Sequence, residues 1–373
     1  MLVRELVADL VEHGGQPAGH HRFQFVKPGH LIWSHVSGSP SVAGSGLGSP
    51  RDILSPLWPL VPSRSHRNSL SGGRSRPSGG ATLAGMRATS GVRHAPDTSG
   101  LREKRRAENF PVALRVLPEQ LRADLVAVYS VARTVDDLGD EAEGDRVAQL
   151  EAFSSELSAA FGNGEPEDPA VRGLLPAIRA GRLTEEPFQR LVQANIQDQR
   201  VHRYPVFADL LAYCRLSADP VGRIVLDLLG VADPAAAGLS DRICTGLQLV
   251  EHWQDVGEDY RNGRIYLPQE DLAEFGVAEE ELGAAHASPR LKALMRWETG
   301  RAAALLGSGA DLLGYLSGWG RFAVSGFLAG GLATVDALRA SGGDVLSAPV
   351  RPSRAGLLSW LGWLQVGTRR RSG

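Results

Sequence analysis

Cysteine is scarce in this sequence, and long apolar runs are absent from it. The 373 residues include only two cysteines, Cys214 and Cys244, and both lie within apolar helical patterns. We therefore expect both cysteines to be small core residues that form no disulfide, as in a protein of the reducing cytosol. No uncharged apolar stretch of about 18 residues or more occurs, so we expect no membrane-spanning helix, and membrane contact would be peripheral.

An excess of one charge is also missing. With 40 basic and 42 acidic residues the formal net charge is −2, which gives no reason to expect a nucleic-acid partner. Because 43% of the residues are hydrophobic, the chain can bury a sizeable core.

Residues 1–100 lack any sustained helical or strand pattern. Glycine, serine, proline and arginine dominate this range, and it cannot bury enough apolar surface to offset the entropy lost on ordering. We predict a disordered, low-complexity extension. No secretory signal is expected, because charged residues interrupt the first apolar ones. A further hypothesis is that translation starts at Met86 and that residues 1–85 come from a start codon assigned too far upstream.

Residues 101–340 have apolar positions at steps of three and four, which predicts helices, and no strand pattern competes. We expect a single-domain, all-α bundle. Beyond the first acidic motif, described below, helices are predicted over 147–161, 171–180, 186–200, 213–229, 241–260, 295–316 and 320–339.

One acidic motif lies in the predicted helix 241–260. Glu251, Asp255 and Asp259 occur at every fourth position, which stacks three carboxylates on one helix face. No Lys or Arg lies one turn from Asp255, and the flanks are apolar. Such oxygens suit Mg²⁺. The alternative is a solvated acidic face. Arg261, Arg264 and Tyr266 follow and can donate to phosphate oxygens.

A second acidic motif lies at 131–141. Its carboxylates are again four apart, Asp136 with Asp140 and Asp137 with Glu141. Arg133 lies four residues before Asp137 and can pair with it, so Asp136 and Asp140 are the better candidates to face a metal. Two such helices facing across a cavity would bind a diphosphate through metal ions.

Both motifs resemble the squalene/phytoene synthase family of head-to-head prenyl synthases. Further matching segments are Glu-Asn-Phe-Pro-Val-Ala at 108–113, Tyr-Cys-Arg-Leu-Ser-Ala-Asp-Pro-Val-Gly at 213–222 and Asn-Gly-Arg-Ile-Tyr-Leu-Pro-Gln-Glu-Asp at 262–271. The likeness covers roughly residues 105–340 and is greatest to the bacterial hydroxysqualene synthase branch, which is associated with hopanoid biosynthesis.

The resemblance implies an isoprenoid-synthase-type bundle with a central active-site cavity, Mg²⁺ as cofactor and an isoprenoid diphosphate as substrate. The implied metal ligands are Asp136, Asp140, Glu251, Asp255 and Asp259. The four aspartates and the pocket tyrosine Tyr129 are the implied catalytic residues. The implied substrate-binding residues are Arg133, Arg264, Tyr266 and Gln248.

In the hydroxysqualene branch, presqualene diphosphate and water give hydroxysqualene and diphosphate without a reductant. The alternative within the family is the coupling of two farnesyl or geranylgeranyl diphosphates to presqualene diphosphate, squalene or phytoene. The resemblance also implies a cytoplasmic enzyme, peripheral at the inner face of the membrane, that works with other hopanoid-pathway enzymes.

Two positions depart from the family pattern. Glu251 stands where asparagine is common and Gln254 where arginine is frequent, and both changes make the diphosphate site more negative. These two departures bear on which reaction of the family is catalysed more than on the fold. Two other classes of function are alternatives. One is a non-catalytic assembly factor with the same fold, in which motif residues would have been lost. The other is a terpene cyclase, whose usual second motif fits this sequence less well than that of the head-to-head enzymes.

Several smaller assignments have two alternatives each. Asp198 either belongs to the site or is a solvated or capping residue. Ser217, Ala218 and Gly222 either make room for a long isoprenoid or serve tight helix packing. Trp253 is expected in the core. Residues 341–373 are expected to be a flexible tail, whose tryptophans, leucines and terminal arginines either lie in a membrane interface or are disordered.

Overall fold

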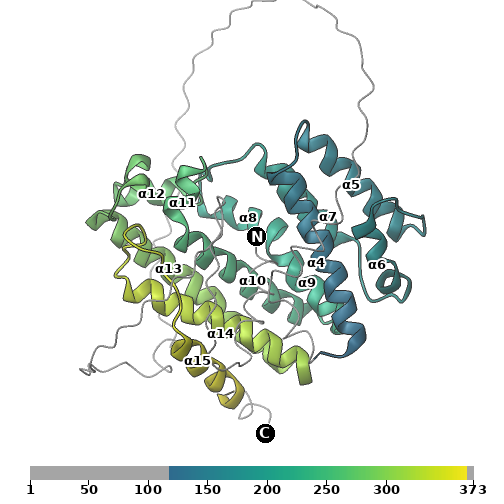
Figure 1. Cartoon of the computed structure of the whole chain (residues 1–373). Helices are drawn as coiled ribbons and strands as arrows, with labels where there is room; N and C mark the ends of the chain where they lie inside the picture. The colour runs from purple at the N-terminus through teal and green to yellow at the C-terminus, as the bar shows by residue number, and fades with distance from the viewer. Residues whose placement is uncertain (1–116, 368–373) are drawn as a thin grey trace, which may run out of the picture. The chain divides into compact units, whose positions relative to one another are not determined.

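The computed structural model describes residues 117–367, and these form an all-α body, as the sequence predicts (Figure 1). The predicted extension 1–100 and the segment 108–113 lie outside the described residues. The helices are α4 (Glu119–Asp140), α5 (Arg146–Phe161), α6 (Pro169–Arg179), α7 (Glu186–Asp198), α8 (Phe207–Ser217), α9 (Asp219–Leu228), α10 (Pro234–Gln254), α11 (Val256–Arg261), α12 (Gln269–Phe275), α13 (Pro289–Gly309), α14 (Gly318–Ala340) and α15 (Arg354–Gly367), with 3-10 turns η2 (Glu279–Gly283) and η3 (Ala310–Gly314).

Helix α10 packs against α8, α9, α13 and α14 and organises the described bundle (Figure 1). The Asp233 carboxylate caps its N-terminus by accepting a hydrogen bond from the Ala235 amide at 2.7 Å. Trp253 is fully buried, and its indole N–H donates to the Glu298 carbonyl of α13 at 3.2 Å. The predictions for Trp253 and for the two buried, free cysteines are therefore confirmed.

Small residues let α9 and α13 approach α10 closely. A Cβ on Gly309 of α13 would lie 2.9 Å from the Leu239 carbonyl, and one on Gly222 of α9 would lie 2.7 Å from the Cys244 sulfur. Gly222 therefore serves helix packing. Ser217, in contrast, lines the larger cavity described below.

Two helices predicted as continuous are broken. The range 213–229 is divided at Ala218 into α8 and α9, because Pro220 has no N–H to continue the helical hydrogen bonds and is tolerated only in a first turn. The range 241–260 is divided at Asp255, whose φ of −102° and ψ of 12° lie outside the helical region. The hydrogen bonds from Asp255 N to Glu251 O and from Asp259 N to Asp255 O persist across this break, so the carboxylates keep their spacing of one turn.

The C-terminal segment differs from the flexible tail expected from the sequence. Helix α15 packs on α14 and runs antiparallel to it (Figure 1). Trp360 and Leu364 are buried, and the Trp360 indole donates to Asp336 of α14 at 2.7 Å. Before α15, Asp344 pairs with Lys292 at 3.0 Å. The surface of the bundle supplies the apolar burial that this segment could not provide by itself.

Within residues 117–367, α14 is the single helix that is long and apolar enough to cross a membrane. However, 56% of the qualifying stretch is buried within the body. Such burial is typical of a core helix of a bundle.

Candidate functional site

The two acidic motifs meet at a cavity that is partly open to solvent. Its walls come from α4, α7, α8 and α10 and from the segment that follows α11. The lining residues are Ala132, Val135, Asp136, Asp140, Leu191, Ala194, Asn195, Asp198, Tyr213, Ser217, Gln248, Glu251, His252, Arg264 and Tyr266. Carboxylates, amides and an arginine thus share this cavity with apolar and aromatic side chains.

The α4 wall carries Asp136 and Asp140. Arg133 pairs with Asp137 at 2.7 Å, as the spacing predicts, and the Arg264 guanidinium lies 3.5 Å from the Asp140 carboxylate. Since Arg264 follows the second acidic motif and Asp140 belongs to the first, this contact joins the two motifs across the cavity.

The opposite wall carries the second motif, but only in part. Glu251 is 8% exposed and lines the large cavity. Asp259 lines a small neighbouring pocket instead. Burial first, and then the nearby Asp255 carboxylate, raises the pKa of Asp259 to about 8. A cation beside these carboxylates would favour their charged forms.

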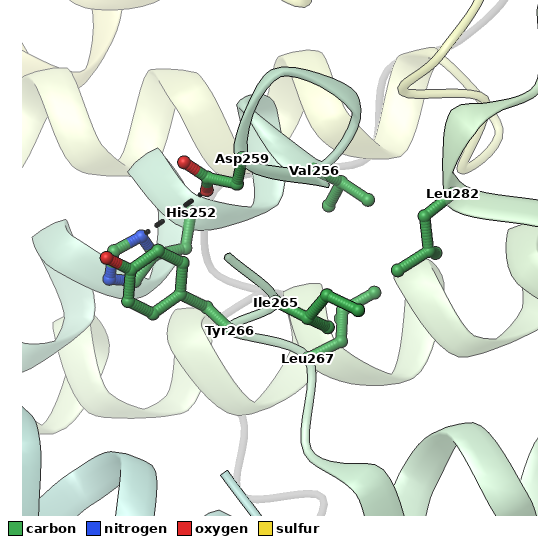
Figure 2. A pocket seen from close by; sticks show the side chains of 7 residues that line it. All are labelled: His252, Val256, Asp259, Ile265, Tyr266, Leu267 and Leu282. Atoms are coloured by element: carbon green, nitrogen blue, oxygen red, sulfur yellow. Dashed lines mark ion pairs between the residues drawn. The ribbon is translucent and has the colours of Figure 1, made fainter. Parts of the chain in front are cut away.

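Four stacked rings form an aromatic wall. The His252 ring lies 3.7 Å from the Tyr266 ring, centroid to centroid, and Tyr266 lies 5.9 Å from Tyr213 and 5.8 Å from Tyr204. Figure 2 shows His252 against Tyr266, with the Asp259 carboxylate pointing at the imidazole. His252 and Tyr266 line both cavities, so this stack lies between the two.

His252 is a neutral member of this wall. Its Nδ1 atom is 3.9 Å from Asp259 Oδ2, but burial, and then the charge of Arg264, lowers the pKa of His252 to about 3. The imidazole and the Asp259 carboxyl therefore do not form an ion pair at neutral pH. On its other side His252 Nε2 lies 3.3 Å from the Gln248 amide, which itself donates to Ser217 Oγ at 2.8 Å.

Asp198, which the sequence left open, belongs to the cavity. Tyr213 donates a hydrogen bond to Asp198 Oδ2 at 2.7 Å, and the buried Oδ1 atom has no hydrogen-bond partner among residues 117–367. Burial raises the pKa of Asp198 to about 6, although the Tyr213 hydrogen bond and Arg264 oppose the shift. Tyr213 was also missed as a site residue, and its only sequence signal was its place in the family-like segment 213–222.

Some predicted site residues lie elsewhere. Tyr129 is buried but is not among the cavity-lining residues; Arg133 is engaged with Asp137, and Asp255 lies at the break between α10 and α11. Arg261 is exposed. Gln254 also faces away, because its amide donates to the Val350 carbonyl at 2.5 Å. The substitution at 254 therefore does not act on the cavity directly.

The carboxylates of the site fit Mg²⁺ by their chemistry. All are hard oxygen donors, and Mg²⁺ usually takes one or two protein carboxylates and completes its octahedron with water and phosphate. Within the described residues, no group of three or more Asp, Glu, His or Cys side chains could hold an ion by itself. Asp136 and Asp140 line the cavity from α4, Asp198 from α7 and Glu251 from α10.

Comparison with known proteins gives the family of this chain. A sequence profile of the squalene/phytoene synthase family matches residues 104–356. The chain belongs to the squalene/phytoene synthase family. This confirms the resemblance seen in the sequence motifs.

Two curated relatives of this synthase show how wide the similarity is. The hydroxysqualene synthase of Rhodopseudomonas palustris is 36% identical over 208 residues, which cover 56% of this chain and 70% of that protein. The 15-cis-phytoene synthase of Synechococcus elongatus is 32% identical over 53% of this chain and 68% of that protein.

A solved structure is also similar. The squalene synthase HpnC from Alicyclobacillus acidocaldarius is 41% identical, covers 66% of this chain and 94% of its own, and has a TM-score of 0.61. The predicted fold, an isoprenoid-synthase-type bundle, and the likeness to the hydroxysqualene branch are therefore confirmed.

Proposed function

We propose that this synthase converts presqualene diphosphate and water to hydroxysqualene and diphosphate with Mg²⁺ as cofactor. The contact of Arg264 with Asp140 across the cavity carries the proposal, because it brings a phosphate-binding cation between the two acidic walls. Two relatives named hydroxysqualene synthase are 36% and 35% identical to this chain, and the structure of HpnC is also similar. These similarities support the hydroxysqualene reaction over the other reactions of the family.

Asp136 and Asp140 on one wall and Glu251 on the other would hold the metal, together with Asp255 and Asp259 farther along the second motif. When bound, Mg²⁺ would act as a Lewis acid that offsets the negative charge of the diphosphate. Arg264 supplies a fixed guanidinium for the same oxygens, since burial of its charge is offset by Asp198 and Asp140 nearby.

The aromatic wall suits a carbocation. Tyr213, Tyr266 and His252 line the cavity, and a cation over an exposed aromatic face gains about 1–2 kcal/mol when desolvated. Neutral His252 adds no positive charge that would repel the cation. Apolar residues such as Val135 and Leu191 complete the lining and restrict access of bulk water.

The water that captures the cation must lose a proton. Asp198 is suited to accept it, because its pKa lies near 6 and its Oδ1 atom makes no hydrogen bond within the described chain. Tyr213 orients this carboxylate through its hydroxyl. In this role Asp198 would act as general base, and Tyr213 would hold it in place.

The test is to incubate the protein with Mg²⁺ and no reductant, separately with presqualene diphosphate and with farnesyl diphosphate, and to identify the products by mass spectrometry. We expect hydroxysqualene from the first and no product from the second. The second candidate is head-to-head condensation, which the phytoene synthase relatives favour. A C30 product from farnesyl diphosphate would establish that alternative.

A further inference from the structure

The short helix α11 depends on its neighbours for its position. It has six residues and follows Asp255, where the backbone leaves the helical path of α10. A helix of this length is unstable by itself in water, because so few hydrogen bonds do not offset the cost of forming the first turn. Asp259 lies on α11, so its placement relative to Asp255 and Glu251 is set by the elements that pack against α11.

One of these elements is the turn η2. A Cβ on Gly283 of η2 would lie 2.7 Å from the ring carbon Cε1 of Tyr260, so that ring lies directly against the turn. Val256 at the start of α11 is buried, and together with Leu282 of η2 it lines the small pocket beside Asp259 (Figure 2). The turn thus holds α11, but it does not reach the end of α10.

The second element is the segment between α14 and α15, residues 341–353, which we call the C-terminal strap. The Leu346 side chain lies against α11 at Gly257, where a Cβ would be 3.0 Å from the Leu346 Cδ2 atom. The Val350 carbonyl accepts a hydrogen bond from the Gln254 amide at 2.5 Å. Gln254 and Gly257 stand on either side of Asp255 in the sequence, so the strap contacts the chain before and after the helix break.

The strap is itself anchored near both ends. Near its start the Asp344 carboxylate accepts a hydrogen bond from the Ala287 amide at 3.0 Å and pairs with Lys292 of α13 at 3.0 Å. At its end the Ser353 hydroxyl accepts a hydrogen bond from the Gly356 amide of α15 at 3.0 Å, and α15 packs on α14. A segment fixed in this way can support the residues that it contacts.

We propose that the C-terminal strap positions the second acidic motif for Mg²⁺ and diphosphate, an inference that rests on the proposed function. The hydrogen bond from Gln254 to Val350 fixes the end of α10, and the contact of Leu346 with Gly257 fixes the start of α11. Gln254 does not line the cavity, so it is a positioning residue that acts through the backbone at Asp255. Such support matters because the residues around metal-binding side chains set their orientation.

The test compares Gln254→Met and Leu346→Ala with the wild type in the full chain. Methionine is about as long as glutamine but has no N–H to donate, so the first variant removes the hydrogen bond to Val350 with little change in volume. Hydrogen–deuterium exchange without ligand should become about tenfold faster at residues 255–262 in both variants and stay unchanged in α4. Isothermal titration calorimetry should show that inorganic diphosphate with Mg²⁺ binds about tenfold more weakly to both.

The chain offers a matched control for each variant. Gln149→Met removes a hydrogen bond of the same kind on α5, from a glutamine amide to the Glu143 carbonyl at 2.8 Å. Leu358→Ala shortens a leucine that is 63% exposed on α15. Both controls should keep the wild-type exchange at residues 255–262 and the wild-type affinity for diphosphate, and circular dichroism establishes that every variant is folded.

The outcomes separate this inference from the proposed function. Wild-type exchange at residues 255–262 in Gln254→Met and Leu346→Ala would overturn the role of the strap, as would faster exchange with unchanged affinity for diphosphate. Equal effects in the controls would do the same. Wild-type protein that binds no diphosphate in the presence of Mg²⁺ would instead contradict the proposed function itself, whereas a product other than hydroxysqualene would leave the role of the strap standing.

Discussion

At the scale of single residues, the ionisable groups of the cavity owe their properties to burial more than to their neighbours in sequence. Burial is the largest cause of the raised pKa of Asp198 and of Asp259, and of the lowered pKa of His252. Burial also keeps the Tyr213 hydroxyl protonated, because it raises the pKa of that group well above its usual value. Asp198 is therefore held by the neutral Tyr213 hydroxyl, with the charged Arg264 guanidinium nearby.

Asp198→Asn tests the proposed general base. The asparagine oxygen can still accept the Tyr213 hydrogen bond, but the amide cannot take up a proton, so we expect turnover of presqualene diphosphate to fall about 100-fold or more. Helix content and melting temperature should stay close to those of the wild type. Exposed Asp209→Asn on α8 is the control, and an Asp198→Asn enzyme with wild-type turnover would remove Asp198 from the mechanism.

Asp219 provides a test of pH dependence outside the cavity lining. Its side chain is 3% exposed and accepts a hydrogen bond from Thr245 at 2.8 Å, and burial raises its pKa to about 7. In the unfolded chain the pKa is about 3.9. Between these values the folded state binds more protons than the unfolded state, so the contribution of Asp219 to the free energy of unfolding falls as pH rises from about 4 to about 7.

Asp219→Asn should therefore remove part of this slope. We expect the free energy of unfolding of the variant minus that of the wild type to increase by a few kcal/mol between pH 5 and pH 8. The wild type loses stability over this range because it must ionise a buried carboxyl, and the variant does not. Urea denaturation at both pH values measures this difference. A constant difference between variant and wild type would show that Asp219 does not titrate in this range.

At the scale of secondary-structure elements, the contact between α10 and α13 depends on missing side chains. Gly309 lies against the backbone of α10, where a Cβ would be 2.9 Å from the Leu239 carbonyl and 3.2 Å from the Ile243 nitrogen. Gly300 lies on the same helix, but a Cβ there would meet no atom within 4 Å. The two glycines thus separate the effect of packing from the effect of helix propensity.

We expect Gly309→Ala to lower the free energy of unfolding by about 1–3 kcal/mol, because α13 would be pushed away from a backbone that cannot rotate aside. Gly300→Ala should raise it by about 0.5–1 kcal/mol, since alanine favours an exposed helix. Urea denaturation with unchanged m-values measures both. Equal shifts in the two variants would mean that the α10–α13 contact is loose.

At the scale of the whole molecule, the site joins helices that are distant in the chain. Asp140 ends α4, while Glu251 lies near the end of α10, and only folding brings both to one cavity. A ligand that bridges the two walls therefore binds the folded protein alone. By mass action, such binding must stabilise the fold.

We expect Mg²⁺ with inorganic diphosphate, each well above its dissociation constant, to raise the melting temperature by roughly 5–10 °C. EDTA should reverse the shift, and the Asp136→Asn, Asp140→Asn variant should lose it. Glu274→Gln, at an exposed acid on α12, should keep the full shift. An unchanged shift in the double aspartate variant would separate diphosphate binding from the first acidic motif.

Much of the fold followed from local pattern. Helical periodicity predicted most of the helices of the described body, and the spacing of Arg133 and Asp137 predicted their ion pair. The misses have local causes that tertiary structure decides: Pro220 breaks a helix whose apolar pattern runs on, and α15 becomes ordered because the bundle provides a partner surface. The roles of the acidic residues remain predictions.

The sequence by itself determined the fold class, the family and the two carboxylate motifs, because helical periodicity and four-residue spacing are properties of neighbouring positions. Only the tertiary structure decided which of these residues share a cavity. It joined Arg264 to Asp140, added Asp198 and Tyr213, and placed Tyr129 and Gln254 outside the lining. It also buried Trp360 and left Trp319 exposed. Contacts between remote helices and burial from water depend on the packing of the whole chain, which no local pattern contains.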